Sequence, residues 1–112
     1  MKVLVITDLC GGFSITLPEK KLYKGLKEMG VKMTVVTHYA TIESEDLEKA
    51  GIQVIYIPIF KKFDFKAVKS LRQILTEGQY DILYITFGKG ITNGLLAARN
   101  IKIKIIGYIG SL

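Results

Sequence analysis

The chain has 112 residues, of which 49% are hydrophobic and 23% are charged, and these proportions describe one globular domain. A single cysteine excludes an internal disulfide framework and cysteine-based zinc or iron–sulfur sites. Sixteen basic residues against ten acidic ones give a net charge of +6, which favours partners that carry phosphate or an anionic membrane surface.

Lysines interrupt every apolar run, so no run approaches the roughly 20 residues that a membrane-spanning helix needs. Asp8 breaks the apolar start of the chain before it reaches the length of a signal peptide. These two observations predict a mature cytoplasmic protein.

Strand-like and helix-like segments alternate along the whole chain. Apolar, β-branched runs predict strands at 2–7, 32–37, 53–59, 81–86 and 103–109. Apolar residues at helical spacing predict helices at 16–30, 43–50, 66–79 and 92–99. This alternation predicts a three-layer α/β/α sandwich with a Rossmann-like parallel sheet of about five strands in the order 3-2-1-4-5.

Three local features refine this prediction. Thr16 is expected to cap the first helix, with Pro18 in the first turn and Glu19 completing a capping box. Pro58 indicates either an outer position for the third strand or the point where its pairing ends. The predicted inward side chains of the first and last helices are Leu22, Leu26, Met29, Leu95, Leu96 and Ala98. The lysines expected on the exposed face of the first helix are Lys20, Lys21, Lys24 and Lys27.

In a sheet of this order, ligands bind where the strand order reverses, at the carboxyl ends of the first and fourth strands. Glycine-rich segments follow both strands and lead into helices whose first amides favour phosphate or another anion. Tight strand-to-helix turns would require the same glycines, and the sequence does not decide between the two roles. The candidate residues in these two segments are Gly11, Gly12, Phe87, Gly88, Lys89 and Gly90.

Other motifs are weaker. Gly88, Gly90 and Gly94 are spaced one residue wider than a dinucleotide fingerprint, and no Walker A sequence occurs. His38 is interpreted as a surface or hydrogen-bonded residue, and Asp8 as a turn or cap residue. No carboxylate pair, catalytic triad or metal-ligand cluster emerges, so we assign no catalytic residue and no metal.

The segment from Phe60 to Arg72 combines aromatic and basic residues. Aromatic side chains that insert at an interface and lysines that meet anionic headgroups are typical of a peripheral membrane surface. A loop whose phenylalanines pack under the sheet edge while the lysines stay solvated would give the same sequence. Nucleic acid is disfavoured, because no base-reading helix or stacking platform is recognisable. The candidate membrane-contact residues are Phe60, Lys61, Lys62, Phe63, Phe65, Lys66, Lys69 and Arg72.

The order of these segments resembles the amino-terminal domain of glycosyltransferases with the two-domain GT-B fold, in the retaining, glycogen-synthase-like or subfamily-4-like group. The likeness covers nearly the whole chain. The residues that carry it are Met1 to Asp8 with Gly11 and Gly12, Leu22 to Thr37, Gly51 to Val54 with Ile57 and Pro58, Leu71 and Arg72, and Tyr80 to Tyr84.

The resemblance implies transfer of a sugar from a nucleotide-sugar donor to a small-molecule or lipid-linked acceptor. A second, carboxyl-terminal Rossmann-like domain would hold most of the donor, and this chain would be the acceptor side of the cleft. In the family the first glycine loop faces the donor phosphates, and the loops after the fourth and fifth strands line the same cleft. Those loops correspond here to Gly11 and Gly12, to Phe87 through Gly90, and to Gly110 and Ser111.

Relatives carry histidines in and after the fourth strand where this chain has Tyr84 and Thr86, so no catalytic role is carried over. The resemblance implies that these 112 residues form the amino-terminal half of a two-domain protein. Alone they would be inactive and hold no cofactor, and the full-length enzyme would be cytoplasmic or peripheral on the inner face of a membrane. The isolated domain would expose surfaces meant for its second half and could self-associate through them.

A flavodoxin-like or receiver-like module is the alternative to a transferase domain. Such a module would stand alone and bind a phosphate-bearing ligand or a protein partner. A receiver needs a cluster of acidic residues near the end of the first strand, and this chain supplies Asp8 alone. A module of this class would saturate with its ligand as it stands, whereas a transferase half would bind nucleotide weakly.

Overall fold

The computed structural model of the chain describes residues 1–8 and 13–107, in which strands and helices alternate as the sequence predicts. The elements are β1 (Lys2–Ile6), α1 (Phe13–Glu28), β2 (Lys32–Thr37), α2 (Ile42–Lys49), β3 (Gln53–Tyr56), α3 (Phe65–Gly78), β4 (Ile82–Ile85), α4 (Gly88–Ala97) and β5 (Lys104–Gly107).

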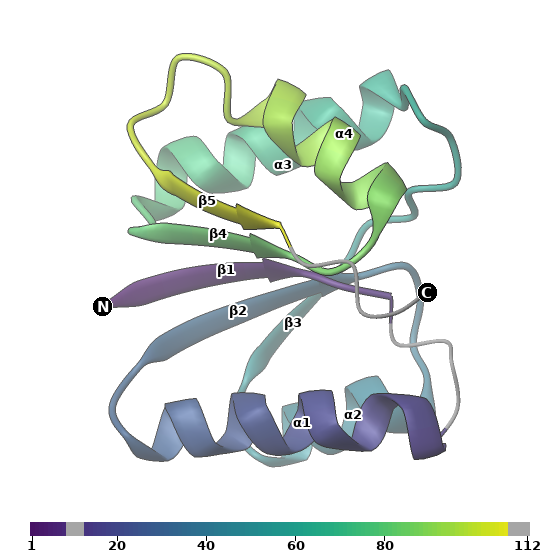
Figure 1. Cartoon of the computed structure of the whole chain (residues 1–112), viewed down its shortest axis with the longest axis vertical. Coiled ribbons are helices and arrows are strands. Elements are labelled where there is room, and N and C mark those ends of the chain that lie inside the picture. The colour runs from purple at the N-terminus through teal and green to yellow at the C-terminus, as the bar shows by residue number, and fades with distance from the viewer. Residues whose placement is uncertain (9–12, 108–112) are drawn as a thin grey trace.

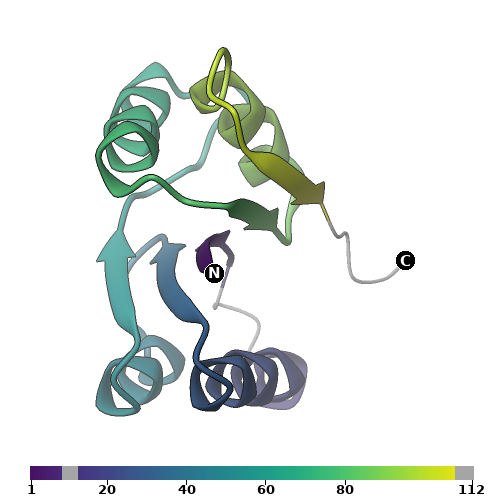
Figure 2. The same cartoon turned by 90° about the vertical axis from the view of Figure 1, so that its left-hand side faces the viewer.

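The strands form one parallel sheet in the order β3-β2-β1-β4-β5, which confirms the predicted α/β architecture. Helices α1 and α2 lie side by side on one face, and α3 and α4 lie side by side on the other (Figures 1 and 2). Because all strands are parallel, their carboxyl ends meet at a single edge, which is the right-hand edge in Figure 1. We call it the carboxyl edge.

Two hydrophobic layers hold the helices on the sheet, because successive strand residues point to opposite faces. Leu4 and Ile6 of β1 pack in the layer under α3 and α4, while Val3 and Val5 pack in the layer over α1 and α2. Every one of these four side chains is buried, so β1 is the central strand in packing as well as in order. A sheet covered on both faces accounts for the unbroken apolar run at the start of the chain.

Helix α1 differs from its prediction at its start and on its faces. It begins at Phe13, so the predicted cap Thr16 lies inside the helix. Tyr23 is the deeply buried side chain, whereas Leu22 and Met29, which were expected inward, are exposed. Lys20, which was expected in solvent, is buried because α2 packs alongside and presents Asp46 to it at 3.3 Å.

Helix α4 begins at Gly88, four residues before the predicted start, so the expected loop is the first turn of the helix. Leu95 and Leu96 are exposed, which corrects their predicted inward orientation, while Ala98 is buried as expected. The buried face of this helix consists of small residues and one amide: Gly90, Asn93, Gly94 and Ala97. Small side chains allow the helix to lie close to the sheet, and the leucines then fall on the outside.

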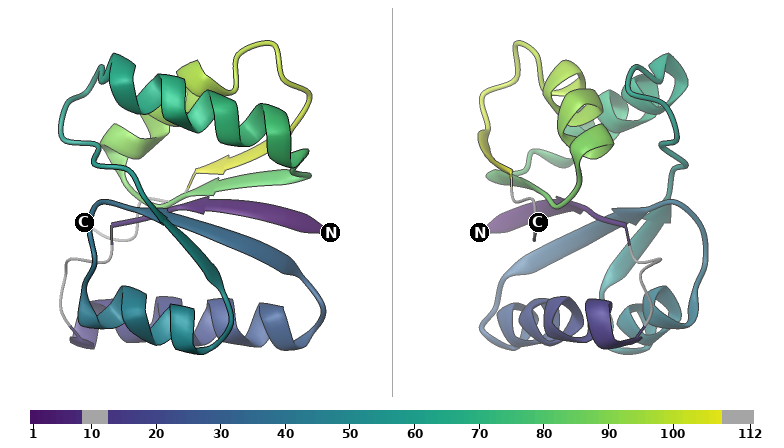
Figure 3. Two further views of the ribbon diagram at one scale, coloured as in Figure 1. Left: turned by 180° about the vertical axis from the view of Figure 1, so that it is seen from behind. Right: turned by 45° about the vertical axis from the view of Figure 1, so that its right-hand side comes forward.

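Strand β3 occupies one border of the sheet, and its pairing ends at Tyr56, two residues before Pro58. Both predictions from Pro58, an outer position for the third strand and the end of its pairing, are therefore confirmed. The chain then climbs along the carboxyl edge from β3 to the start of α3 on the opposite face (Figure 3, left). This crossover, residues 57–64, brings the aromatic and basic segment to the edge where ligands bind in such sheets.

Candidate functional site

The strand order reverses between β1 and β4, and two threonines join the strand ends at that point. Oγ1 of Thr86 donates a hydrogen bond to Oγ1 of Thr7 at 2.8 Å. The backbone continues the pairing, because the amide of Thr86 donates to the carbonyl of Ile6 at 3.1 Å. Thr7 is fully buried, so this pair forms a polar floor to the reversal point rather than an exposed surface.

Helix α4 begins directly after Phe87, the residue that follows Thr86 in the sequence. Phe87 occupies the N-cap position in an extended conformation and gives no side-chain hydrogen bond to the first turn. The first amides of a helix lack acceptors within the helix, and they carry the positive end of its dipole. The first turn of α4 is therefore suited to an anionic group such as phosphate.

The two glycines of this turn have different roles. A Cβ added at Gly90 would lie 2.8 Å from the ring of Phe87 and 3.0 Å from Cγ2 of Ile85, so Gly90 allows the turn to pack on β4. A Cβ added at Gly88 would meet nothing within 4 Å. Packing accounts for Gly90, and Gly88 remains exposed at the start of the helix.

His38 directly follows β2 and contacts two other loops of the carboxyl edge. Its Nδ1 accepts a hydrogen bond from the amide of Ile59 at 3.0 Å, so the ring holds its proton on Nε2 when neutral. The ring stacks on Phe60 with centroids 5.1 Å apart and meets the Phe87 ring edge-on at 5.3 Å. This confirms His38 as a hydrogen-bonded residue, and its surroundings are those of a structural group.

Asn93 fastens the crossover to α4 from beneath. The side chain is fully buried, and its Oδ1 accepts from the amide of Asp64 at 2.8 Å. Its Nδ2 donates to the carbonyls of Lys61 and Lys89 at 2.9 and 2.8 Å. Both polar atoms of this buried amide are thus hydrogen-bonded, and two of its three bonds hold the crossover backbone against the first turn of α4.

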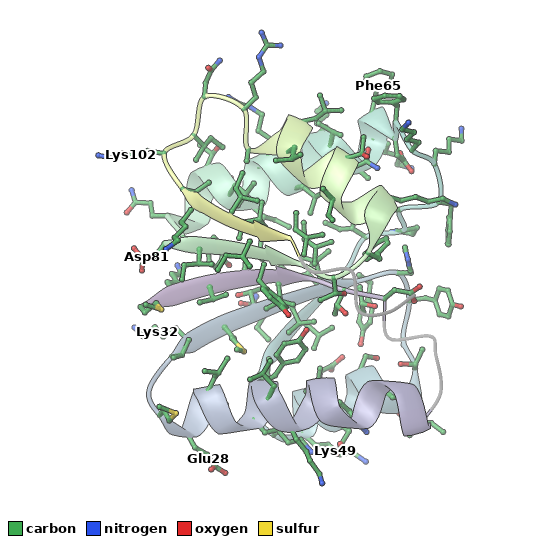
Figure 4. The ribbon with its side chains drawn as sticks, viewed as in Figure 1. Glu28, Lys32, Lys49, Phe65, Asp81 and Lys102 are labelled. Atoms are coloured by element: carbon green, nitrogen blue, oxygen red, sulfur yellow. The ribbon has the colours of Figure 1, made fainter. Side chains whose placement is uncertain are left out.

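The three phenylalanines of the crossover and the start of α3 are exposed. Phe60, Phe63 and Phe65 have 58%, 56% and 77% of their surface accessible, so the alternative in which they pack under the sheet is wrong. Phe65 projects outward at the upper right of Figure 4. Together with the neighbouring exposed lysines they form what we call the aromatic–basic surface: Phe60, Lys61, Lys62, Phe63, Phe65, Lys66 and Lys69.

Two predicted site residues make contacts that the sequence did not indicate. Arg72 donates from Nη1 to the carbonyls of Ala97 and Arg99 at 3.1 and 2.6 Å, so it caps the end of α4. Lys89 donates from Nζ to the carbonyl of Phe60 at 3.0 Å, which ties the first turn of α4 to the crossover.

The remaining candidates, Gly11, Gly12, Gly110 and Ser111, lie outside the described residues, and so does Cys10. Among residues 1–8 and 13–107, no three His, Cys, Asp or Glu side chains gather as metal ligands would. Within the same residues no helix has the length and apolar character needed to cross a membrane.

Two ionisable groups with a shifted pKa, Asp46 of α2 and Tyr56 of β3, make their contacts on the side of the sheet that α1 and α2 cover. Hydrogen bonds from Lys24 and then Lys20 hold the pKa of Asp46 below its usual value. Desolvation, followed by its hydrogen bond to Glu48, raises the pKa of Tyr56. Asp46 connects α2 to α1, and Tyr56 connects β3 to α2. Neither residue is close in sequence to the first turn of α4.

Asn93 is the important residue that the sequence interpretation missed. It shares a helical face with Gly90 and Ala97, three positions before and four after it. A stripe of small residues in a helix indicates close packing, and an amide within that stripe indicates a buried polar contact. The adjacent Leu95 and Leu96 conceal this pattern, because their hydrophobicity indicates a buried face on the opposite side of the helix.

No protein-family profile matches the sequence, and no curated protein matches it significantly. Several solved structures share the fold. The glycosyltransferase from Rickettsia africae ESF-5 matches 95% of this chain over 28% of its own length, with a TM-score of 0.80 and 16% identity. MurG from Acinetobacter baumannii matches 96% of this chain over 34% of its length, with a TM-score of 0.70 and 18% identity.

Alr3699/HepE from Anabaena, solved with UDP and glucose, matches 96% of this chain over 29% of its own length, with a TM-score of 0.72 and 17% identity. The same protein has also been solved with UDP-glucose. The chain therefore spans about a third or less of each of these proteins. At these identities the likeness shows a shared Rossmann-like fold.

Proposed function

We propose that this chain is the amino-terminal, acceptor-side domain of a two-domain glycosyltransferase that uses a nucleotide-sugar donor. The observation that carries the proposal is the match of nearly the whole chain to about a third of proteins that include a named glycosyltransferase and one solved with UDP-glucose. A second domain would hold most of the donor. The exposed first turn of α4 would meet the donor phosphates across the cleft.

The first test is the intact mass of the native protein from its source. The chain has a mass of 12.5 kDa and spans 28% to 34% of the matched proteins, so a native mass of about three times this value supports the proposal. A native mass of 12.5 kDa would overturn it. In that case a stand-alone phosphate-binding module would become the better explanation.

A second test concerns the first turn of α4 in the full-length protein. Gly88→Glu adds a negative charge where a Cβ meets nothing, and an acidic residue suits a helix start. We expect the fold to stay intact while the KM for the nucleotide-sugar rises about tenfold or more, because a carboxylate repels phosphate. As a control, Thr76→Glu adds the same charge at an exposed position in the last turn of α3 and should leave the KM unchanged.

The finer assignment is to the retaining, glycogen-synthase-like group of GT-B enzymes, and we keep it as part of the proposal. It is supported by the resemblance of the segment order. Proton NMR of the first product gives the anomeric configuration directly. Retention of the donor configuration supports this group, and inversion would remove it while leaving the glycosyltransferase proposal in place.

A further inference from the structure

The aromatic–basic surface leaves a concentration of large apolar groups in solvent that packing of this domain does not explain. Phe63 and Phe65 lie on either side of Asp64, the N-cap of α3, and each has more than half of its surface exposed. Exposed aromatic groups that cluster on one segment mark an interaction surface.

The charge around these rings is predominantly positive. Segment 60–72 contains five basic residues and one acidic residue, Asp64. The carboxylate of Asp64 accepts a hydrogen bond from the amide of Ala67 and so serves the start of α3. Lys62 extends over the ring of Phe63, with Nζ 5.8 Å from its centroid, which places cation and aromatic ring side by side. A partner for this surface must accept apolar rings and carry negative charge.

The backbone that carries the rings is held in place from the protein side. Asn93 binds the amide of Asp64 and the carbonyl of Lys61, and Lys89 binds the carbonyl of Phe60. The ring of His38 stacks under Phe60. These contacts fix the backbone of the crossover while the side chains of Phe63 and Phe65 stay exposed, so the exposed rings stand on an ordered backbone before any partner binds.

The position of the surface relates it to the candidate site. The crossover follows β3 and reaches α3 along the carboxyl edge, the same edge that carries the first turn of α4 (Figures 3 and 4). A flat partner seated on the aromatic–basic surface would therefore lie beside the edge where the acceptor is expected.

We propose that the aromatic–basic surface docks the protein on an anionic lipid bilayer. The phenylalanines enter the interfacial region, and the lysines contact phosphate headgroups. A bilayer fits better than nucleic acid, because the rings stand out on a loop and a helix start rather than forming a platform on which bases stack. Resting on the proposed function, this docking would give the site access to a lipid-linked acceptor.

The test is co-sedimentation of the full chain with vesicles, without nucleotide-sugar or acceptor. We expect binding to phosphatidylcholine vesicles that contain about 30% phosphatidylglycerol, little binding to phosphatidylcholine alone, and loss of binding as salt rises. Removing three surface charges should weaken binding about a hundredfold. That variant carries Lys61→Gln, Lys62→Gln and Lys66→Gln.

A matched control removes the same amount of charge from three exposed lysines that lie far from Phe65 in Figure 4. This control should change binding less than about threefold. The control carries Lys32→Gln, Lys49→Gln and Lys102→Gln.

The aromatic arm of the test uses Phe63→Ser with Phe65→Ser, which should weaken binding about tenfold or more. Met29→Ser with Ile42→Ser, both more than three-quarters exposed, is its control and should have no effect.

Three results would overturn the proposal: no binding to anionic vesicles, equal losses in the control variants, or phenylalanine-dependent binding of a single-stranded oligonucleotide in place of vesicles. Vesicle binding requires no catalysis, so the outcome is independent of the native-mass test of the proposed function. A chain of native mass 12.5 kDa that still binds vesicles through this surface would keep the docking proposal and lose the transferase one.

Discussion

Thr86 and Thr7 share a hydrogen bond of 2.8 Å between their side-chain oxygens, at the ends of two neighbouring strands where the strand order of the sheet reverses. Thr7 is buried without an exposed face, and Thr86 is half-buried. The pair joins β1 to β4 just beyond their last ladder partners, Ile6 and Ile85. Polar groups at this depth stabilise the junction only while they remain paired.

A double-mutant cycle with Thr7→Val and Thr86→Val measures this junction. Valine has the shape of threonine without the hydroxyl, so each single variant leaves one polar group without this partner. We expect a coupling free energy of unfolding of about 0.5–1.5 kcal/mol from urea denaturation of the four proteins. Strictly additive effects would mean that the hydrogen bond contributes nothing to stability.

Asn93→Ala should destabilise the chain by about 2–4 kcal/mol, because it leaves an amide and two carbonyls without their partner. Asn93→Asp keeps an acceptor for the amide of Asp64 but places a charge against two carbonyl oxygens. It should therefore be at least as harmful at neutral pH. Chemical denaturation gives the free energy of unfolding, and faster hydrogen exchange at the amide of Asp64 would locate the effect at the crossover.

His38→Phe separates the two contacts of this side chain. Phenylalanine preserves stacking with Phe60 and Phe87 but removes the acceptor of the Ile59 amide. We expect a loss of about 1–3 kcal/mol in unfolding free energy, with a larger loss for His38→Ala, which removes the ring as well. If the two variants unfold alike, the aromatic contacts do not contribute.

Gly90→Ala and Gly88→Ala differ by two positions in the same helical turn and should act in opposite directions. The added methyl at Gly90 meets Ile85 and Phe87, so we expect destabilisation of about 1–3 kcal/mol. At Gly88 the methyl has open space, and the lower backbone entropy of the unfolded chain should give a gain of up to about 1 kcal/mol. Thermal and urea unfolding of both variants decide the point.

Asp46→Asn should show a pH-dependent loss of stability. Hydrogen bonds from Lys24 and Lys20 lower the pKa of Asp46 from 3.8 in the folded chain. The ionised carboxylate therefore stabilises the fold at pH values above the pKa that Asp46 has in the unfolded chain. That contribution disappears as the pH falls through the lower folded pKa. The difference between wild type and variant should therefore be present at neutral pH and shrink below about pH 4, as measured by urea unfolding across the range. A pH-independent difference would assign the effect to packing.

The sheet could be predicted because its pattern is carried by long apolar runs and their spacing. The run from Lys2 to Ile6 has no helical spacing, and it lies in the centre of a sheet covered on both faces. Pro58 marked the end of pairing because proline lacks the amide that a ladder requires.

The faces of the helices were predicted less well, because a neighbouring helix decides them. Lys20 is buried only because α2 presents Asp46 to it, and that contact spans two helices. Leu95 and Leu96 are exposed because the opposite, small-residue face of α4 approaches the sheet. Candidate-site geometry depended on the same contacts, so Asn93 and the capping role of Arg72 could not be derived from spacing alone.

Helices α3 and α4 are fastened to each other at two separate points. At the carboxyl edge Asn93 holds the residue that caps the start of α3, and beyond the opposite end of α4 Arg72 holds the carbonyl of Arg99. Two helices joined at two separate points cannot rotate freely about either contact, so we expect them to move as one rigid body. A ligand that displaces the first turn of α4 is therefore expected to tilt Phe63 and Phe65 with it, which would couple occupancy of the site to the angle at which the domain rests on its partner.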